Sequence, residues 1–340
     1  MSDYLRYLTP QDLAPFQNKR ANEQHVADRV QLCDAALPLA QNLSQAKRNG
    51  VRYVLVGVPE DIGPRANCGN GGANLGWQNF LDVCLNQQAN QFFDWSSCLL
   101  LGALEVADLQ RRSYLESGNS VTVEQLRELC QELDARLVSL LIPIFSQDFE
   151  IIVIGGGHNN AYPIIKALNE ATAKPVACTN LDPHADFRAM EGRHSGNPFR
   201  YAYHEQALSH YCVLGLHEQK NNQATVQGLM AAKFPFYSFQ SLFMRQETSL
   251  TQALNDASTY VSGVENIGVE LDVDAVKNAG ASAYSISGFS VEQAMQYVHT
   301  LSKNPNVKYL HLCEGAPMDE GNDTGQLLTQ LVYSYLTARN

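Results

Sequence analysis

FEIIVIGGGH, residues 149–158, is the segment that points most directly to a fold class. Its first six positions are apolar except for Glu150, a pattern typical of a parallel strand that is covered on both faces. Three glycines follow, and they permit a sharp turn and a close approach of the backbone to a ligand. His158 then stands at the carboxyl end of the strand. We interpret it as a candidate site residue, although a single histidine after glycines also fits a structural role.

Short apolar runs of the same kind alternate with longer amphipathic segments along the rest of the chain. We predict strands over 52–58, 98–106, 149–154, 175–181, 211–216, 234–239, 266–273 and 307–312. We predict helices over 121–145, 161–171, 224–232, 250–261, 291–302 and 325–338. Strands separated by crossover helices indicate an α/β fold with a mostly parallel sheet between two helical layers. Residues 1–50 are more polar and are predicted to be an N-terminal helical extension of a domain that spans residues 51–340.

The composition excludes several classes of protein. The 340 residues are 45% hydrophobic, enough for a large core, and the net charge of −11 without a basic run argues against a nucleic-acid partner. No apolar run approaches the ~20 residues that span a bilayer, and the first residues lack the apolar segment of a signal peptide. Eight scattered cysteines without a CxxC pair indicate free thiols, and hence a cytoplasmic location.

The predicted strand at 175–181 leads into the sequence DPHAD, residues 182–186. Asp182, His184 and Asp186 are two positions apart, so an extended segment projects them from one face. Two carboxylates at the end of a buried strand repel each other unless a cation compensates for them, and a divalent metal ion does so best. The alternative is a capped loop that carries surface acids.

A second pair of acids lies in the strand predicted over 266–273. Asp272 and Asp274 are again two apart, and buried aspartates are rare without a cation. The alternative is a helix cap followed by a surface acid. Glu270 has the same alternation, but we place it further back along the strand and do not count it as a ligand.

The six candidate ligands suit two metal ions better than one. They are His158, Asp182, His184, Asp186, Asp272 and Asp274. Four carboxylates and two imidazoles are too many for one tetrahedral zinc. Ligation by oxygen and imidazole without thiolate favours two Mn2+ ions, although other divalent metals are possible. A water molecule between two such ions would be acidified to hydroxide near neutral pH.

These motifs resemble those of the arginase/agmatinase superfamily, the ureohydrolases. GGGH ending at His158, DPHAD over 182–186 and LDVD over 271–274 stand in the order of that family's three metal motifs, and the resemblance spans roughly residues 50–335. It implies a three-layer arginase-type domain with an eight-stranded parallel sheet, a binuclear manganese centre and a homo-oligomer.

Within the superfamily the chain looks most similar to the formimidoylglutamases. Gly157 stands where arginases and agmatinases usually carry aspartate, and Phe187-Arg188 follows the second metal motif. Ser-Gly-Asn-Pro-Phe, residues 195–199, places Phe199 near the position at which arginases supply a proton-shuttle histidine. His194 is a nearby candidate for that shuttle.

The resemblance also suggests how a substrate is held. Arg188 would grip a substrate carboxylate, since a guanidinium binds carboxylate bidentately, although it also fits a counter-ion role beside the aspartates. Glu314, in a Glu-x-x-Pro segment, would bind an amidine or guanidine group, or else cap a helix. The other candidate substrate contacts are Asn197 and Arg65. Arg193 and Arg200 are expected to be surface residues that could assist.

The function that the resemblance implies is hydrolysis of N-formimino-L-glutamate to glutamate and formamide. Asp186 would orient the attacking hydroxide and pass its proton to the leaving amine, while Glu314 holds the amidinium. One alternative is a ureohydrolase that releases urea from a guanidino acid. An alternative of another class is a non-catalytic metal-binding homologue with a regulatory role. A one-zinc deacetylase on a related fold is disfavoured by the six ligands.

Overall fold

The computed structural model describes residues 4–17, 20–114, 121–318 and 323–339. Ten strands form one sheet in the order β1-β4-β3-β5-β10-β9-β6-β7-β8, with β2 paired to β4. The strands are β1 Leu5–Tyr7, β2 Gln31–Leu32, β3 Tyr53–Gly57, β4 Cys98–Leu104, β5 Glu150–Ile154, β6 Val176–Leu181, β7 Leu208–Leu216, β8 Phe236–Ser238, β9 Asn266–Asp272 and β10 Val307–Cys313. Every pairing from β4 to β8 is parallel. All eight predicted strands are therefore confirmed.

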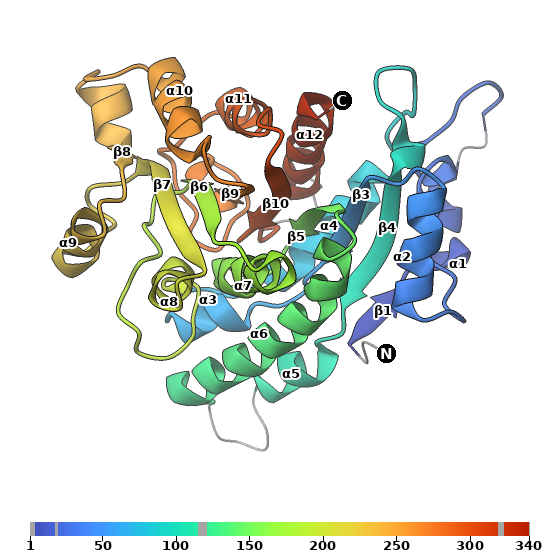
Figure 1. Ribbon diagram of the computed structural model, residues 1–340, viewed down its shortest axis with the longest axis horizontal. Coiled ribbons are helices and arrows are strands. Elements are labelled where there is room, and N and C mark those ends of the chain that lie inside the picture. The colour runs from blue at the N-terminus through green and yellow to red at the C-terminus, as the bar shows by residue number, and fades with distance from the viewer. Residues whose placement is uncertain (1–3, 18–19, 115–120, 319–322, 340) are drawn as a thin grey trace.

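Helices cover both faces of the sheet. Figure 1 shows α6, α7 and α8 on one side and α10, α11 and α12 on the other. The helices are α1 Pro10–Leu13, α2 Leu39–Arg48, α3 Ile62–Ala66, α4 Gly76–Cys84, α5 Ala107–Arg112, α6 Val123–Phe145, α7 Ala161–Thr172, α8 Pro198–His204, α9 Gln223–Ala231, α10 Leu250–Val261, α11 Val291–Leu301 and α12 Asp323–Ala338. The six predicted helices are confirmed within three residues at each end. The expected three-layer αβα fold is thus present.

The hydrophobic core is divided by the sheet into two clusters. Tyr53 and Leu55 of β3 belong to the cluster beneath α4, α10, α11 and α12. Val54 and Val56 of the same strand belong to the cluster beneath α2, α3, α6, α7, α8 and α9. Successive side chains of a strand point to opposite faces, so a strand buried on both sides must be apolar at nearly every position. This requirement produces the continuous apolar runs of the sequence.

The first 50 residues are less helical than the sequence predicts. They include α2, but β1 pairs antiparallel with β4 and β2 pairs parallel with β4, so the segment also completes an edge of the sheet. Leu43 of α2 and Val26 are buried in the two core clusters. Strands of two or three residues are too short to show periodicity, and for this reason the pattern did not reveal them.

A cluster of ion pairs around the buried Glu150 holds the amino-terminal end of β5. The carboxylate of Glu150 accepts hydrogen bonds from Arg52 at 2.7 Å, Arg339 at 2.9 Å and the hydroxyl of Tyr335 at 2.9 Å. Arg339 lies beyond α12, so these contacts connect the end of the described chain to the centre of the sheet. The cluster lies at the opposite end of β5 from His158.

The carboxyl ends of four adjacent central strands, β5, β10, β9 and β6, form the edge at which the candidate site residues lie. In parallel α/β sheets this edge is where ligands bind. Within the described residues, no helix combines the length and hydropathy that crossing a membrane requires. The eight cysteines are free thiols, as predicted.

Candidate metal centre

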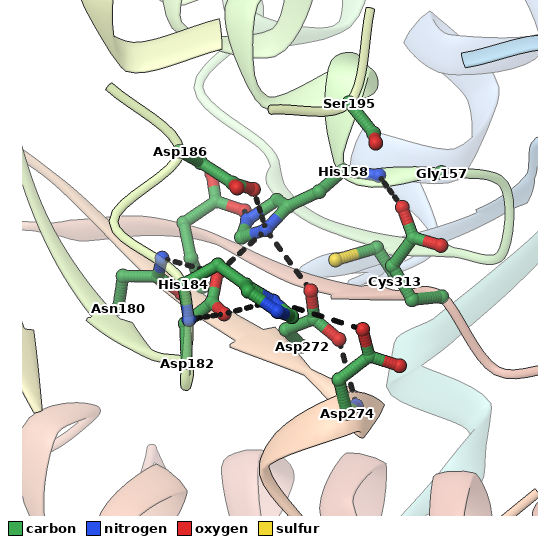
Figure 2. Close-up of polar contacts among 12 residues, drawn as sticks. Gly157, His158, Asn180, Asp182, His184, Asp186, Ser195, Asp272, Asp274 and Cys313 are labelled. Carbon is green, nitrogen blue, oxygen red and sulfur yellow. Dashed lines mark hydrogen bonds and ion pairs between the residues drawn. The ribbon is translucent and has the colours of Figure 1, made fainter. Parts of the chain in front are cut away.

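The six predicted ligands meet at the carboxyl edge of the sheet, as Figure 2 shows. They form two groups in which the ligand atoms lie within 4.8 Å of one another. One group is His158, Asp182, Asp186 and Asp272, and the other is His184, Asp272 and Asp274. Asp272 belongs to both groups. A carboxylate shared between two sets of ligands has the arrangement that a pair of neighbouring cations requires.

In the first group, the ring of His158 is surrounded by carboxylates. Its Nδ1 lies 2.8 Å from Oδ2 of Asp186 and 3.0 Å from Oδ2 of Asp182. Oδ2 of Asp272 is 3.4 Å from the same nitrogen. Among the described residues, neither ring nitrogen of His158 has a hydrogen-bond partner, and the ring is fully buried. An imidazole nitrogen without a hydrogen bond amid three carboxylate oxygens fits a ligand of a metal ion.

Backbone hydrogen bonds orient three of the carboxylates, Asp182 of the first group, Asp274 of the second and the shared Asp272. Asp182 and Asp272 each accept a bond of 2.7 Å, from the backbone N–H of His184 and Asp274 respectively. Asp274 accepts one of 2.9 Å from the N–H of Ala283. For Asp272 and Asp274 these bonds occupy one oxygen and leave the other available. Oδ2 of Asp182 also accepts a bond of 3.0 Å, from the side-chain amide of Asn180. The His184 ring is 29% exposed and is the most open of the six side chains.

The four carboxylates outnumber the two imidazoles that face them. Burial and the nearby Asp182 raise the pKa of Asp186 to about 6 and that of Asp272 to about 6. Burial, followed by the charge of Asp272, raises the pKa of Asp274 to about 8. Crowding four buried carboxylates is unfavourable unless they take up protons or bind cations. Divalent cations fit this donor set of oxygens and imidazoles.

The glycine-rich turn is shaped by a buried glutamate that the sequence reasoning did not single out. Gly156 has φ +73°, and a Cβ at Gly157 would lie 2.3 Å from Cδ of Pro64. The space beside the turn is occupied by the carboxylate of Glu60. Its donors are the backbone N–H groups of Ile62, Gly63 and Gly157 and the side-chain amides of Asn159 and Asn160. These five donors compensate for the buried Glu60 and fix the backbone that carries His158.

Two acidic residues adopt left-handed backbone conformations at this edge. Asp186 has φ +43° and Glu314 has φ +60°. Such values are strained for residues other than glycine and occur at functional sites. Oε1 of Glu314 accepts a 2.7 Å bond from the backbone N–H of His158. Its Oε2 is buried and has no partner within the described part of the chain. This oxygen can accept a hydrogen bond from a substrate.

Of the three other candidate substrate contacts, one side chain is half-exposed and two are held by hydrogen bonds within the protein. Arg188 is 47% exposed and lies 3.5 Å from Glu191. Arg65 donates to Asp61 at 2.9 Å and to the carbonyl oxygen of Ser113 at 2.7 Å. Asn197 is fully buried, and its Oδ1 accepts a bond from a guanidinium of its own loop at 2.7 Å. We therefore assign Arg65 and Asn197 to the architecture of the site.

The expectation that Arg193 is a surface residue is wrong. Arg193 is 1% exposed, donates to Oδ2 of Asp134 at 2.8 Å and stacks on Tyr162 and Tyr201. Its partner comes from α6, about 60 residues earlier in the chain, and local sequence gave no signal of it. Arg200 is partly exposed and stacks on a phenylalanine ring.

The structure does not support His194 as a proton shuttle. The side chain is fully buried. Burial and the charge of Arg127 lower its pKa to about 3, so that it stays neutral at physiological pH. Phe199 packs edge-on against the His158 ring at 5.3 Å and stacks on Tyr211 at 4.1 Å. An apolar ring therefore stands beside the candidate ligand.

Known proteins share this fold. The model of the arginase family matches residues 51–337. A formimidoylglutamase of Legionella pneumophila is 22% identical over 99% of this chain and 99% of its own. The crystal structure of Trypanosoma cruzi formiminoglutamase with Mn2+2 has a TM-score of 0.69 at 23% identity, covering 88% of this chain and 98% of that chain. Formimidoylglutamase from Bacillus subtilis has a TM-score of 0.74 at 18% identity, covering 96% and 94%. The likeness to these structures shows the same fold.

Proposed function

We propose that this chain, which belongs to the arginase family, hydrolyses N-formimino-L-glutamate to glutamate and formamide with two bound Mn2+ ions. The observation that carries the proposal is the pair of ligand groups that share Asp272. The similarity to a formimidoylglutamase along the whole chain and to the folds of formimidoylglutamase and formiminoglutamase structures supports the choice of substrate.

His158, Asp182, Asp186 and Asp272 would hold one ion, and His184, Asp272 and Asp274 the other. Oxygen and imidazole ligands suit manganese, and thiolate is not required. The raised pKa values of Asp186, Asp272 and Asp274 are consistent with a site built for added positive charge. When bound, two such ions acidify a water molecule near neutral pH and stabilise negative charge on a reacting oxygen.

The protein's own groups would then position the substrate and move protons. Oε2 of Glu314 would accept a hydrogen bond from the protonated formimino nitrogen, while its Oε1 stays bonded to the N–H of His158. Asp186 would receive a proton at the oxygen that does not face His158 and deliver it to the departing amine. The bond between the formimino carbon and the glutamate nitrogen breaks, and water supplies the oxygen of formamide.

Arg188 is the cation that we assign to a substrate carboxylate. It lies two residues after Asp186, and its side chain packs against Gly196, where a Cβ would lie 2.8 Å from Cδ of Arg188. The Arg188 side chain is half-exposed, so its guanidinium is accessible to a ligand. A guanidinium can bind a carboxylate through two parallel hydrogen bonds. Arg193, in the same loop, is already neutralised by Asp134.

The decisive experiment identifies the product after the protein is loaded with Mn2+. N-formimino-L-glutamate should yield one formamide for each glutamate. Urea released from a guanidino acid, with no turnover of the formimino compound, would replace this proposal with a ureohydrolase. Bound metal without hydrolysis of any amidine or guanidine would favour a non-catalytic homologue.

We also propose a cytoplasmic homo-oligomer. Free thiols at all eight cysteines support a reducing compartment. Light scattering during gel filtration tests the assembly, and cell fractionation tests the location. A monomer, or a protein recovered outside the cytoplasm, would contradict the respective part.

A further inference from the structure

Glu270 is a fully buried carboxylate that lies behind the candidate metal centre. It stands on β9 two residues before Asp272, and on β10 its partner in register is His311. The hydroxyl of Tyr309 donates to its Oε1 at 2.6 Å, and Nδ1 of His311 lies 2.6 Å from its Oε2. Gly268 leaves room for the Tyr309 ring to reach Glu270, because a Cβ at Gly268 would lie 2.2 Å from Cζ of Tyr309.

The carboxylate faces the ring of His158 from the side opposite the aspartates. Oε2 of Glu270 lies 3.5 Å from Nε2 of His158, whereas Nδ1 of the same ring faces Asp182 and Asp186. An imidazole that ligates a metal ion through Nδ1 carries its proton on Nε2. Glu270 is the carboxylate that faces this proton, with Oε2 within 3.5 Å of the nitrogen.

Two other contacts restrict how the pair can move. Tyr309 and His311 hold both oxygens of Glu270, and Phe199 packs against the His158 ring. The ligand atoms of His158, His311 and Cys313 also lie within 4.8 Å of one another. A proton on Nε2 of His158 removes the lone pair that a cation bound by these three residues would need. We therefore assign His311 and Cys313 to packing around the His158 ring and not to a further metal site.

We infer that Glu270 is a positioning residue that fixes the orientation and tautomer of His158 and thereby strengthens one of the two metal sites. The inference rests on the proposed metal centre. Carboxylates that accept a hydrogen bond from a metal-binding histidine raise the basicity of that ligand and orient it. Because Glu270 faces His158 and not the more exposed His184, its effect falls on the ion held with Asp182 and Asp186.

The test is the substitution Glu270→Gln, which keeps the shape of the side chain and removes its charge. Stepwise calorimetric titration with Mn2+ should show one of the two ions bound ~10- to 100-fold more weakly, with the other unchanged. Electron paramagnetic resonance at two equivalents should show a coupled Mn2+ pair in the wild type and isolated bound Mn2+ in the variant. A role only in folding would not weaken one site selectively.

Glu150→Gln is the matched control, because Glu150 is also a buried strand glutamate bonded to a tyrosine hydroxyl, at the far end of β5. It should lower stability and leave both Mn2+ affinities unchanged.

Tyr309→Phe, which removes only one hydroxyl, should weaken the same metal site less than Glu270→Gln does. It also covers the case in which the Glu270→Gln variant does not fold. Equal weakening of both sites, or no weakening in either variant, would overturn the inference alone. A wild-type chain that binds no ion pair would overturn the proposed function and the inference together.

Discussion

Glu314→Gln is the substitution that tests the substrate geometry most directly. Oε1 of Glu314 accepts a bond from the backbone N–H of His158, and only an oxygen can accept that bond. Glutamine would therefore keep its oxygen on His158 and turn its NH2 group toward the position of Oε2. The substrate amidinium would then meet a second donor in place of a carboxylate oxygen.

The expected loss follows from this geometry. A hydrogen bond to a charged group contributes about 1.5–3 kcal/mol, which corresponds to about a 10- to 150-fold fall in kcat/KM. The formimino group is already positively charged before the reaction, so most of the loss should appear in KM. Because Glu314 belongs to neither group of candidate ligands, both Mn2+ ions should remain bound.

Steady-state kinetics with N-formimino-L-glutamate, together with metal analysis of the same preparation, separates the two possible roles. Retention of two Mn2+ ions with a large rise in KM supports amidine binding. Unchanged kcat/KM would refute the reasoning, since the carboxylate would then not touch the substrate. Loss of metal would instead show that Glu314 mainly supports the backbone of His158.

Four further results are expected. Asp186→Asn should lower kcat by about 10²- to 10⁴-fold with the fold retained by circular dichroism, and a near-normal rate would exclude its role in proton transfer. Arg188→Ala should raise KM for the acidic substrate about 10- to 150-fold without affecting an amidine that lacks carboxylates; equal effects on both would exclude carboxylate binding. In EDTA, the melting temperature should fall as pH rises from about 4 to 8. The folded state keeps protons on carboxyl groups such as Asp274, whose pKa is raised to about 8, whereas the unfolded chain has released them. Added Mn2+ should remove this pH dependence, and a melting temperature in EDTA that does not change with pH would contradict the expectation. Asp134→Asn should destabilise the protein in urea at pH 8 by about 3–5 kcal/mol, because it leaves the buried Arg193 without its counter-ion, and an unchanged midpoint would show that the pair contributes little.

The sequence was sufficient for the strands that are buried on both faces. Val54 and Leu55 of β3 face different core clusters, and this double burial imposes a continuous apolar run that local pattern can reveal. The pairs of acids two positions apart after β6 and at the end of β9 were equally legible in the sequence. Their geometry was not, because Asp186 has φ +43° and Asp274 lies in a 3-10 turn, so neither continues its strand. The sequence showed that Glu270 shares the alternation of Asp272 and Asp274, but it did not predict the role of Glu270. That role depends on the neighbouring strand β10, which brings Tyr309 and His311 beside Glu270.

The sequence could not predict which arginines are free to bind a substrate, because their partners are distant in the chain. The sequence predicted Arg65 and Arg188 as substrate contacts and Arg193 as a surface residue, and the surroundings of these side chains depend on residues distant in the chain. Asp134 on α6 neutralises Arg193, and Ser113 after α5 engages Arg65. A guanidinium that already meets buried acceptors loses those bonds if it turns to a ligand, and leaving them unsatisfied is costly. Arg188 is half-exposed, follows the candidate ligand Asp186 by two residues and can exchange solvent for a substrate carboxylate without that penalty. We therefore assign the recognition of acidic substrates to Arg188 rather than to the more deeply buried Arg65 and Arg193.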